Sequence, residues 1–256
     1  MASVKDDDAL VKAYLAMKKR LDAATLPTLP IDIGHTVFRY INPAGTYSLL
    51  AKPAKGQSVP KAKVDALLAP GDGVKELGNR YSGPPEKTAL YQSWAPKPGS
   101  AAVAAGILPM GGFYCALQQQ AIVLEAAHHG NKVQPWALTG KCVLRMRVTQ
   151  QISVAELSPH NPTSRRLLRE LGRGVEDEMK DPKDCSVARG IGLAIAQCSY
   201  LSGMTAQTVR ESERSDEEKG DNLVLFAPQD VKLAYLEVDK VIFFGKTREP
   251  EIFDVA

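Results

Sequence analysis

The spacing of apolar residues predicts a helix near the start of the chain. Within residues 7–24 apolar side chains recur every three or four positions, whereas the lysines fall mainly between them, as in an amphipathic helix that packs one face on a core. The apolar positions are Leu10, Tyr14, Met17 and Leu21. Pro27 and Pro30 then end the helix, because proline cannot continue one.

Further along, the pattern changes between strands and helices. Strands are predicted where β-branched and aromatic residues cluster or where polar and apolar residues alternate, at residues 35–41, 89–93, 141–148, 222–226 and 231–244. Helices are predicted at residues 118–129, 161–171 and 187–201. Residues 51–76 are predicted to be loop with one short helix, and the Gly- and Pro-rich residues 96–112 to be loop. This mixture favours a single domain of the α/β or α+β class.

Glu125 lies in an uncharged stretch of the chain. It is the only formally charged side chain within residues 98–131, and in a helix it would have Ala121 and Ile122 on one side and the pair His128-His129 on the other. Two interpretations are open. Glu125 is either a surface residue on a short amphipathic helix, or a catalytic carboxylate whose burial requires a partner or hydrogen bonds.

Composition and charge are those of an ordinary globular protein. The 256 residues are 44% apolar and 24% charged, and the net charge of +3 is too small to indicate a nucleic-acid partner. The acidic N-terminus lacks the apolar segment of a secretory signal. Prolines, glycines and glutamines within residues 98–124 argue against a membrane-spanning helix. We therefore expect a soluble, cytoplasmic protein that binds neither nucleic acid nor a membrane.

Common catalytic and metal-binding motifs are absent from the sequence. The four cysteines form no C-x-x-C pair and have no histidine at zinc spacing, so we expect free thiols in a reducing compartment and no bound metal. No P-loop, H-E-x-x-H or G-x-S-x-G motif occurs. Gly190-Ile191-Gly192 is only a G-x-G inside a helical pattern, which is a weak indication of nucleotide binding.

An ordered series of polar residues on predicted strand ends and turns is more informative. The series comprises Arg39-Tyr40, Arg80-Tyr81 after a Gly-Asn turn, Tyr91, Ser93, Glu125, Ser212 and Arg214. Taken singly, each of these residues is typical of a solvated or packed structural position. In this order, however, the series resembles the RES domain, the toxin half of many bacterial toxin–antitoxin pairs, which is named for its functional Arg, Glu and Ser residues.

The resemblance extends over about residues 37–230. Its matching segments are Val37-Phe38-Arg39-Tyr40 with the first strand, Gly78-Asn79-Arg80-Tyr81-Ser82 with the Gly-rich turn, Ala89-Leu90-Tyr91-Gln92-Ser93 with the next strand, residues 121–128 with the helix, and Ser212 with the strand at residues 222–226. The chain departs from the family in having Tyr81 in place of the usual Trp, Asn79 between the glycines, an insertion near residues 94–112, and an enlarged acidic loop before Asn222.

The resemblance implies both a fold and a substrate. The fold is α+β and ADP-ribosyltransferase-like, with a split, bent β-sheet and surrounding helices around a cleft for NAD. Residues 1–30 would form an N-terminal helical extension and residues 31–256 the RES-like catalytic domain. NAD would be the substrate, and no further cofactor is needed.

The residue types suit cleavage of the nicotinamide–ribose bond, which passes through an oxocarbenium-like state. A carboxylate such as Glu125 would stabilise the developing positive charge, arginine forks would bind the pyrophosphate, and tyrosines would stack on the nicotinamide or donate to the ribose. The implied catalytic residues are Glu125, Arg80 and Ser212. The implied NAD-binding residues are Arg39, Tyr40, Tyr81, Tyr91, Ser93 and Asn222.

Three functions are open at this point. The first is a toxin that depletes NAD as a glycohydrolase or phosphorylase, the second is an ADP-ribosyltransferase that modifies a protein, and the third is a non-catalytic member that only binds NAD or a partner. A toxin of this kind needs a cognate antitoxin or immunity protein, so we expect such a partner.

Overall fold

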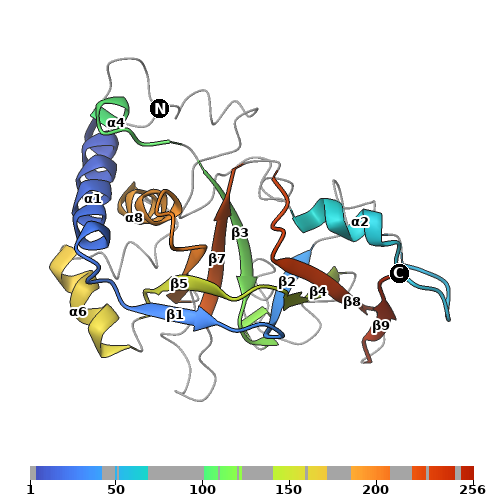
Figure 1. Cartoon of the computed structure of the whole chain (residues 1–256). Coiled ribbons are helices and arrows are strands. Elements are labelled where there is room, and N and C mark those ends of the chain that lie inside the picture. The colour runs from blue at the N-terminus through green and yellow to red at the C-terminus, as the bar shows by residue number, and fades with distance from the viewer. Residues whose placement is uncertain are drawn as a thin grey trace.

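The computed structural model describes residues 4–41, 50, 52–68, 101–108, 110–119, 121–122, 141–158, 161–171, 186–207, 221–228, 231–245 and 249–256. Within them, one sheet contains nine strands in the order β1-β5-β6-β7-β3-β2-β4-β8-β9 (Figure 1). The strands are β1 (Thr28–Ile31), β2 (Thr36–Ile41), β3 (Gly111–Ala116), β4 (Lys141–Val148), β5 (Ile152–Glu156), β6 (Gly203–Gln207), β7 (Asp221–Ala227), β8 (Leu236–Phe244) and β9 (Glu251–Asp254). Of these neighbouring pairs only β5 and β6 are parallel. The described part of the chain between them includes helices at residues 162–171 and 186–196, as is usual for a parallel connection.

Helices cover the sheet from different sides. They are α1 (Val4–Asp22), α2 (Lys61–Asp65), the 3-10 helix η1 (Ala66–Leu68), α4 (Ala101–Ala104), α6 (Pro162–Leu171) and α8 (Ser186–Ala196). Figure 1 shows α1, α4, α6 and α8 together at one end of the molecule and α2 beside β8 at the other. The expected mixed α/β single domain is confirmed.

Most strongly patterned segments form the predicted elements. The helix predicted at residues 7–24 is α1, the strand at 141–148 is β4, and the helix at 161–171 is α6. Two predictions were too long: α8 ends at Ala196 and β8 begins only at Leu236. The helix predicted at 118–129 is helical at residues 119, 121 and 122, and its remainder lies outside the described residues, as does the strand predicted at 89–93.

Two strands contradict the sequence-based interpretation. Pro30 was expected to lie beyond the helix in a connection, but it belongs to β1, which is an edge strand, the position where a missing N–H is tolerated. Residues 96–112 were expected to be loop, yet α4 lies within them and Gly111 and Gly112 begin β3. Because β3 lies between β7 and β2, backbone pairing on both sides fixes it despite its two glycines.

One core cluster joins the N-terminal helix to the sheet. Leu10, Tyr14 and Met17 of α1 pack with Ile191 of α8 and Val224 of β7 in a single buried cluster. The helix predicted as an N-terminal extension is therefore packed into the core of the domain. Helix α8 lies very close to α1, since a Cβ atom added at Gly190 would be 2.3 Å from the carbonyl oxygen of Leu10.

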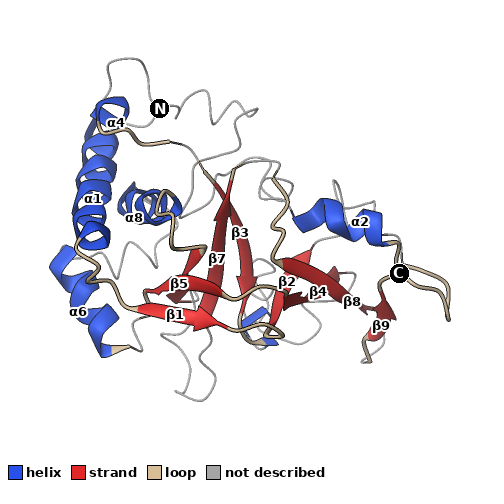
Figure 2. Cartoon of the chain, in the orientation of Figure 1, coloured by secondary structure: helices blue, strands red, loops and turns tan. Residues whose placement is uncertain are grey.

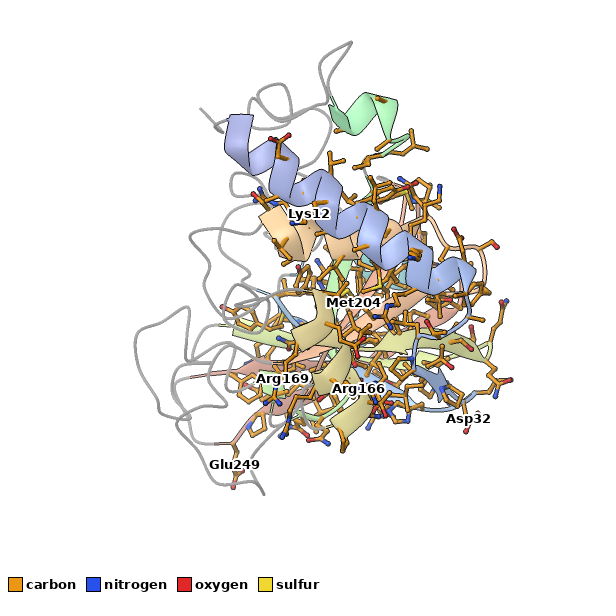
Figure 3. All side chains as sticks on the ribbon, turned by 90° about the vertical axis from the view of Figure 1, so that its left-hand side faces the viewer. Lys12, Asp32, Arg166, Arg169, Met204 and Glu249 are labelled. Atoms are coloured by element: carbon orange, nitrogen blue, oxygen red, sulfur yellow. The ribbon has the colours of Figure 1, made fainter. Side chains whose placement is uncertain are left out.

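Helix α6 is linked to α1 by charged side chains at the surface. Glu170 accepts hydrogen bonds from Arg166 Nε at 2.9 Å and from Arg20 Nη2 of α1 at 2.5 Å, and these two arginines hold the pKa of Glu170 below its ordinary value. Figure 3 places Lys12 of α1 above Arg166 and Arg169 of α6, on the same side of the molecule.

A second buried cluster lies on the opposite face of the sheet. Strand β7 contributes to both faces, with Leu223 and Leu225 in the second cluster and Val224 and Phe226 in the first. This explains why residues 222–226 form an almost continuous apolar run, as expected of a strand covered on both faces.

The sheet is divided at the boundary between β3 and β2. Every other neighbouring pair is registered over three or more residues, whereas in the described part of the chain β2 and β3 are registered at the single pair Phe38–Ala116. One half contains β1, β5, β6, β7 and β3, and the other contains β2, β4, β8 and β9. In Figure 2, β3 and β7 run upright while β8 slopes across the view. This division matches the expected split sheet.

Candidate functional site

The structure describes three of the predicted site residues. Arg39 and Tyr40 lie on β2, at the division of the sheet, and Asn222 lies on β7. The other predicted site residues are outside the described part of the chain, namely Arg80, Tyr81, Tyr91, Ser93, Glu125 and Ser212.

The register of the strands separates Arg39 from the other two. Side chains alternate along a strand, so Arg39 shares one face with its neighbour Leu144 of β4, and Tyr40 shares the other with Val143. Asn222 pairs with Ala116, which in turn pairs with Phe38. Tyr40 and Asn222 therefore lie on one face of the sheet, and Arg39 lies on the opposite face.

Arg39 contacts an aromatic ring across the division of the sheet. Its guanidinium carbon Cζ lies 4.0 Å from the centroid of the Phe113 ring on β3, the geometry of a cation–π interaction. Phe113 is fully buried, whereas Arg39 is half-buried. Phe113 was not predicted as a site residue, because no strand was predicted at residues 111–116. The short apolar run of residues 113–116 is the sequence signal that indicates this strand.

Two neutral polar groups belong to the same face. Burial raises the pKa of the Cys115 thiol to about 12, and the charge of nearby Arg39 offsets this rise only in part. Burial, aided by Cys115, also raises the pKa of Tyr235. Both groups are therefore neutral at physiological pH, so the charge of Arg39 lies near an uncharged thiol, and that thiol lies near the uncharged hydroxyl of Tyr235.

Tyr40 lies close to the start of the segment that leads to Glu125. Together with Phe38 it packs against a buried cluster that contains Ala121 and Ile122. These two residues have helical conformation and are the last described residues before Glu125. The fold thus brings the N-terminal part of the predicted catalytic helix to the face of β2 that carries Tyr40.

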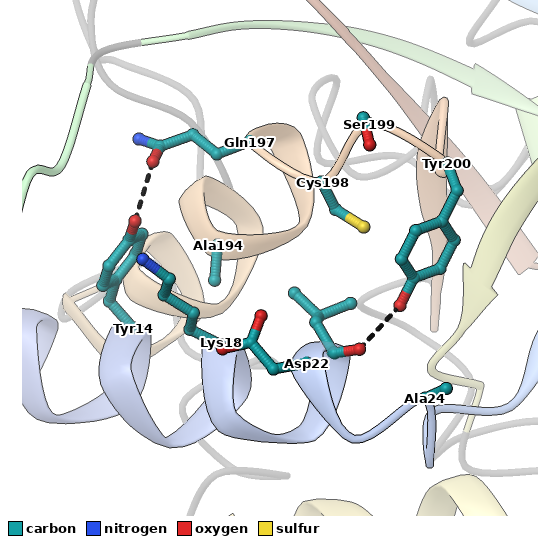
Figure 4. Close-up of a pocket in the computed structure, with 10 residues that line it drawn as sticks. Tyr14, Lys18, Asp22, Ala24, Ala194, Gln197, Cys198, Ser199 and Tyr200 are labelled. Carbon is teal, nitrogen blue, oxygen red and sulfur yellow. Dashed lines mark hydrogen bonds between the residues drawn. The ribbon is translucent and has the colours of Figure 1, made fainter.

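A separate pocket of about 410 Å³ lies between α1 and α8 (Figure 4). At one end the Tyr14 hydroxyl donates to Gln197 Oε1 at 2.7 Å, and at the other the Tyr200 hydroxyl donates to the carbonyl oxygen of Leu21 at 3.0 Å. Lys18 also lines the pocket. These two hydrogen bonds connect α1 with the segment that follows α8.

The described residues contain neither a candidate membrane span nor a candidate metal cluster. No helix there is long and apolar enough to cross a membrane. The same part of the chain contains no cluster of three or more His, Cys, Asp or Glu side chains that could hold a metal ion. Cys115, Cys142 and Cys198 are free thiols, as expected, and Cys185 lies outside the described residues.

Comparison with known proteins supports the fold. No model of a protein family matches the chain, and no curated protein matches it. Among solved structures, it is similar to a chain in the crystal structure of the M. tuberculosis MbcT–MbcA toxin–antitoxin complex, with a TM-score of 0.51 and 17% sequence identity. The similarity covers 90% of this chain and 92% of that one. This mixed α/β protein therefore shares its fold with a component of a toxin–antitoxin complex.

Proposed function

We propose that this protein is a toxin that consumes NAD by cleaving its nicotinamide–ribose bond, with water or phosphate as the acceptor. The observation that carries the proposal is the division of the sheet between β2 and β3. A cationic side chain, Arg39, and an aromatic hydroxyl, Tyr40, occupy β2 at this point, in a fold shared with a component of a toxin–antitoxin complex.

The division of the sheet accounts for how one ligand could use both side chains. Arg39 and Tyr40 point to opposite faces of β2, so a single molecule contacts both only at an edge of the strand. The short pairing of β2 with β3, registered among the described residues at Phe38–Ala116, favours such an edge at this boundary. There, the guanidinium of Arg39 would bind the pyrophosphate, and Tyr40 would stack on or donate to the nicotinamide riboside.

Glu125 is the proposed stabiliser of the oxocarbenium-like transition state. Glu125 follows Ile122 by three residues, so the Cα atoms of the two residues are at most about 11 Å apart. Ile122 belongs to the buried cluster against which Tyr40 packs. This proximity along the chain supports placing the Glu125 carboxylate near a ligand held at β2. Arg80 and Ser212 complete the proposed catalytic set, on the basis of the sequence resemblance alone.

A toxin that depletes NAD also endangers the cell that makes it, so we propose a cognate antitoxin or immunity protein as its partner. The similar solved structure is a complex of a toxin with an antitoxin, which supports this part of the proposal.

The test is NAD turnover by the purified protein with and without phosphate, with products separated by chromatography. Glu125→Ala is compared with Glu251→Ala, a control that removes a carboxylate from the edge strand β9. Loss of NAD in the wild type and the control but not in Glu125→Ala supports the proposal. ADP-ribose as product indicates hydrolysis, and a phosphorylated ADP-ribose formed only with phosphate indicates phosphorolysis. Stable NAD in both buffers contradicts NAD consumption and directs the search to an ADP-ribosylated protein target.

A further inference from the structure

We propose that Phe113 is a positioning residue for NAD, which acts by fixing the direction of the Arg39 guanidinium. This inference rests on the proposed function, in which Arg39 binds the pyrophosphate. It assigns a role to a residue that the sequence resemblance does not include, on a strand that the sequence pattern did not predict.

The position of the Phe113 ring follows from the register of β3. Phe113 lies three residues before Ala116, which pairs with Phe38 of β2, and it shares its face of the sheet with Arg39. It pairs with Leu225 of β7 on its other side. This pairing anchors Phe113 in the half-sheet that does not contain Arg39, so the contact between the two side chains connects the two halves.

The contact between Arg39 and Phe113 supplements a short backbone pairing between β2 and β3. Among the described residues, β2 and β3 are registered at the pair Phe38–Ala116, and the contact between Arg39 and Phe113 adds a side-chain link between the strands next to that pair. The Phe113 ring has no exposed surface, and close packing of an interior side chain restricts its motion. The Arg39 guanidinium lies 4.0 Å from this ring, so an immobile aromatic surface restricts its orientation.

The surroundings favour this contact, and the two titratable groups considered with it are uncharged. The terminal nitrogen Nη1 of Arg39 is shielded from solvent, and cation–π attraction increases when the cation is desolvated. Cys115 and Tyr235 are held in their neutral forms by burial, so neither provides a negative charge that competes with a bound pyrophosphate.

Fixing the guanidinium has a defined kinetic consequence. A bidentate contact requires the planar fork to face the anion, and an arginine already held in that direction loses less freedom on binding. Because the pyrophosphate is remote from the bond that breaks, Phe113 should affect substrate and transition-state binding equally. Its removal should therefore raise KM and leave kcat unchanged.

The experiment compares Phe113→Leu with Phe243→Leu. Phe243 belongs to the same buried cluster, but it packs edge-on against Phe253 at 5.5 Å, far from the β2–β3 boundary in the strand order. Both variants lose a buried ring, so the control reports the general cost of a weaker core. Phe113→Met, which fills irregular space better, is included in case Phe113→Leu does not fold. The measurements are KM and kcat for NAD, and the NMR order parameter of Arg39 Nε.

We expect Phe113→Leu to raise KM by about 2- to 30-fold, the equivalent of one cation–π contact, with unchanged kcat and a lower order parameter for Arg39 Nε. Phe243→Leu should change none of these. Equal KM values and order parameters in the two variants would overturn the role of Phe113 while NAD turnover by the wild type still stands. No NAD turnover or binding by the wild type would overturn the proposed function, and with it this role.

Discussion

Substitution of Gly190 tests the packing of the N-terminal helix most directly. Gly190 lies in the middle of α8, and the space that a side chain would need is occupied by the backbone of α1. An added Cβ would lie 2.3 Å from the carbonyl oxygen of Leu10 and 3.0 Å from both Ala13 Cβ and the Tyr14 nitrogen. A backbone atom cannot rotate away, so Gly190→Ala must push the helices apart by about 1 Å, given ordinary contacts near 3.5 Å.

Two opposing effects set the expected change in the free energy of unfolding of Gly190→Ala. Overpacking a well-filled core costs typically 1–3 kcal/mol, and the upper value of about 3 kcal/mol applies here because the obstacle is backbone. Alanine is a better helix former than glycine by about 1 kcal/mol. The expected net loss in the free energy of unfolding is therefore about 2 kcal/mol, or about 4–8 °C in Tm for a chain of this size.

The assay is thermal and urea denaturation of Gly190→Ala beside Gly34→Ala. Gly34 has a φ of +86° but no atom within 4 Å of an added Cβ, so its substitution carries backbone strain of about 1 kcal/mol without a clash. A second variant that adds Ala13→Gly should restore little stability, because the Leu10 oxygen remains in place. A Gly190→Ala protein as stable as wild type, or more stable, would refute the close approach of α1 and α8.

Three further predictions concern other parts of the fold. Burial raises the pKa of Cys115 and of Cys142 from 9.0 to about 12, so these thiols ionise in the unfolded chain before they do so in the folded protein. Stability should then fall between about pH 9 and 12, by up to about 1.4 kcal/mol per pH unit for each thiol, and Cys142→Ala should make the fall shallower in urea titrations. Asn161 Oδ1 accepts hydrogen bonds from the first N–H groups of α6 at 2.9 and 3.3 Å. Asn161→Ala should therefore lower the free energy of unfolding by about 1 kcal/mol, and Asn161→Asp by much less. Equal losses in the two variants would contradict this helix cap. Asp239 accepts two hydrogen bonds from Arg145, at 3.0 and 2.6 Å. Asp239→Ala should therefore lower the free energy of unfolding by about 1 kcal/mol at low salt and by less at high salt. A stability loss that does not depend on salt would indicate that packing dominates.

The sequence predicts the fold best where local patterns and tertiary packing agree. The helix at α1 has an apolar stripe that coincides with its buried face, and β7 is an apolar run that is buried on both faces. Strands β1, β3, β5, β6 and β9 were not predicted. In β1 and β3 the reason is that proline and glycine weaken a strand locally. Their neighbours in the sheet supply the pairing that holds them, and a local pattern does not contain this information.

The candidate site shows the same limit. The sequence resemblance places Arg39 and Tyr40 in one group, but only the register of the strands reveals that they face opposite sides. Phe113 carries no charge and no hydrogen-bonding group, so residue type alone gives no reason to select it. Its relation to Arg39 depends on the pairing of β2 with β3, two strands that are about 70 residues apart in the chain.

The contact between α1 and α8 has a consequence for how this protein matures on the ribosome. Helix α1 is made before α8, the partner that buries Leu10 and Tyr14, and about 180 residues separate the two helices in the chain. At a synthesis rate of about 5–20 residues per second, α1 waits roughly 10–40 s for α8 to emerge. During this interval its apolar stripe lacks the partner that buries it and is open to chaperones. The buried cluster that α1 and α8 share, and any activity that depends on it, can therefore form only after α8 has emerged.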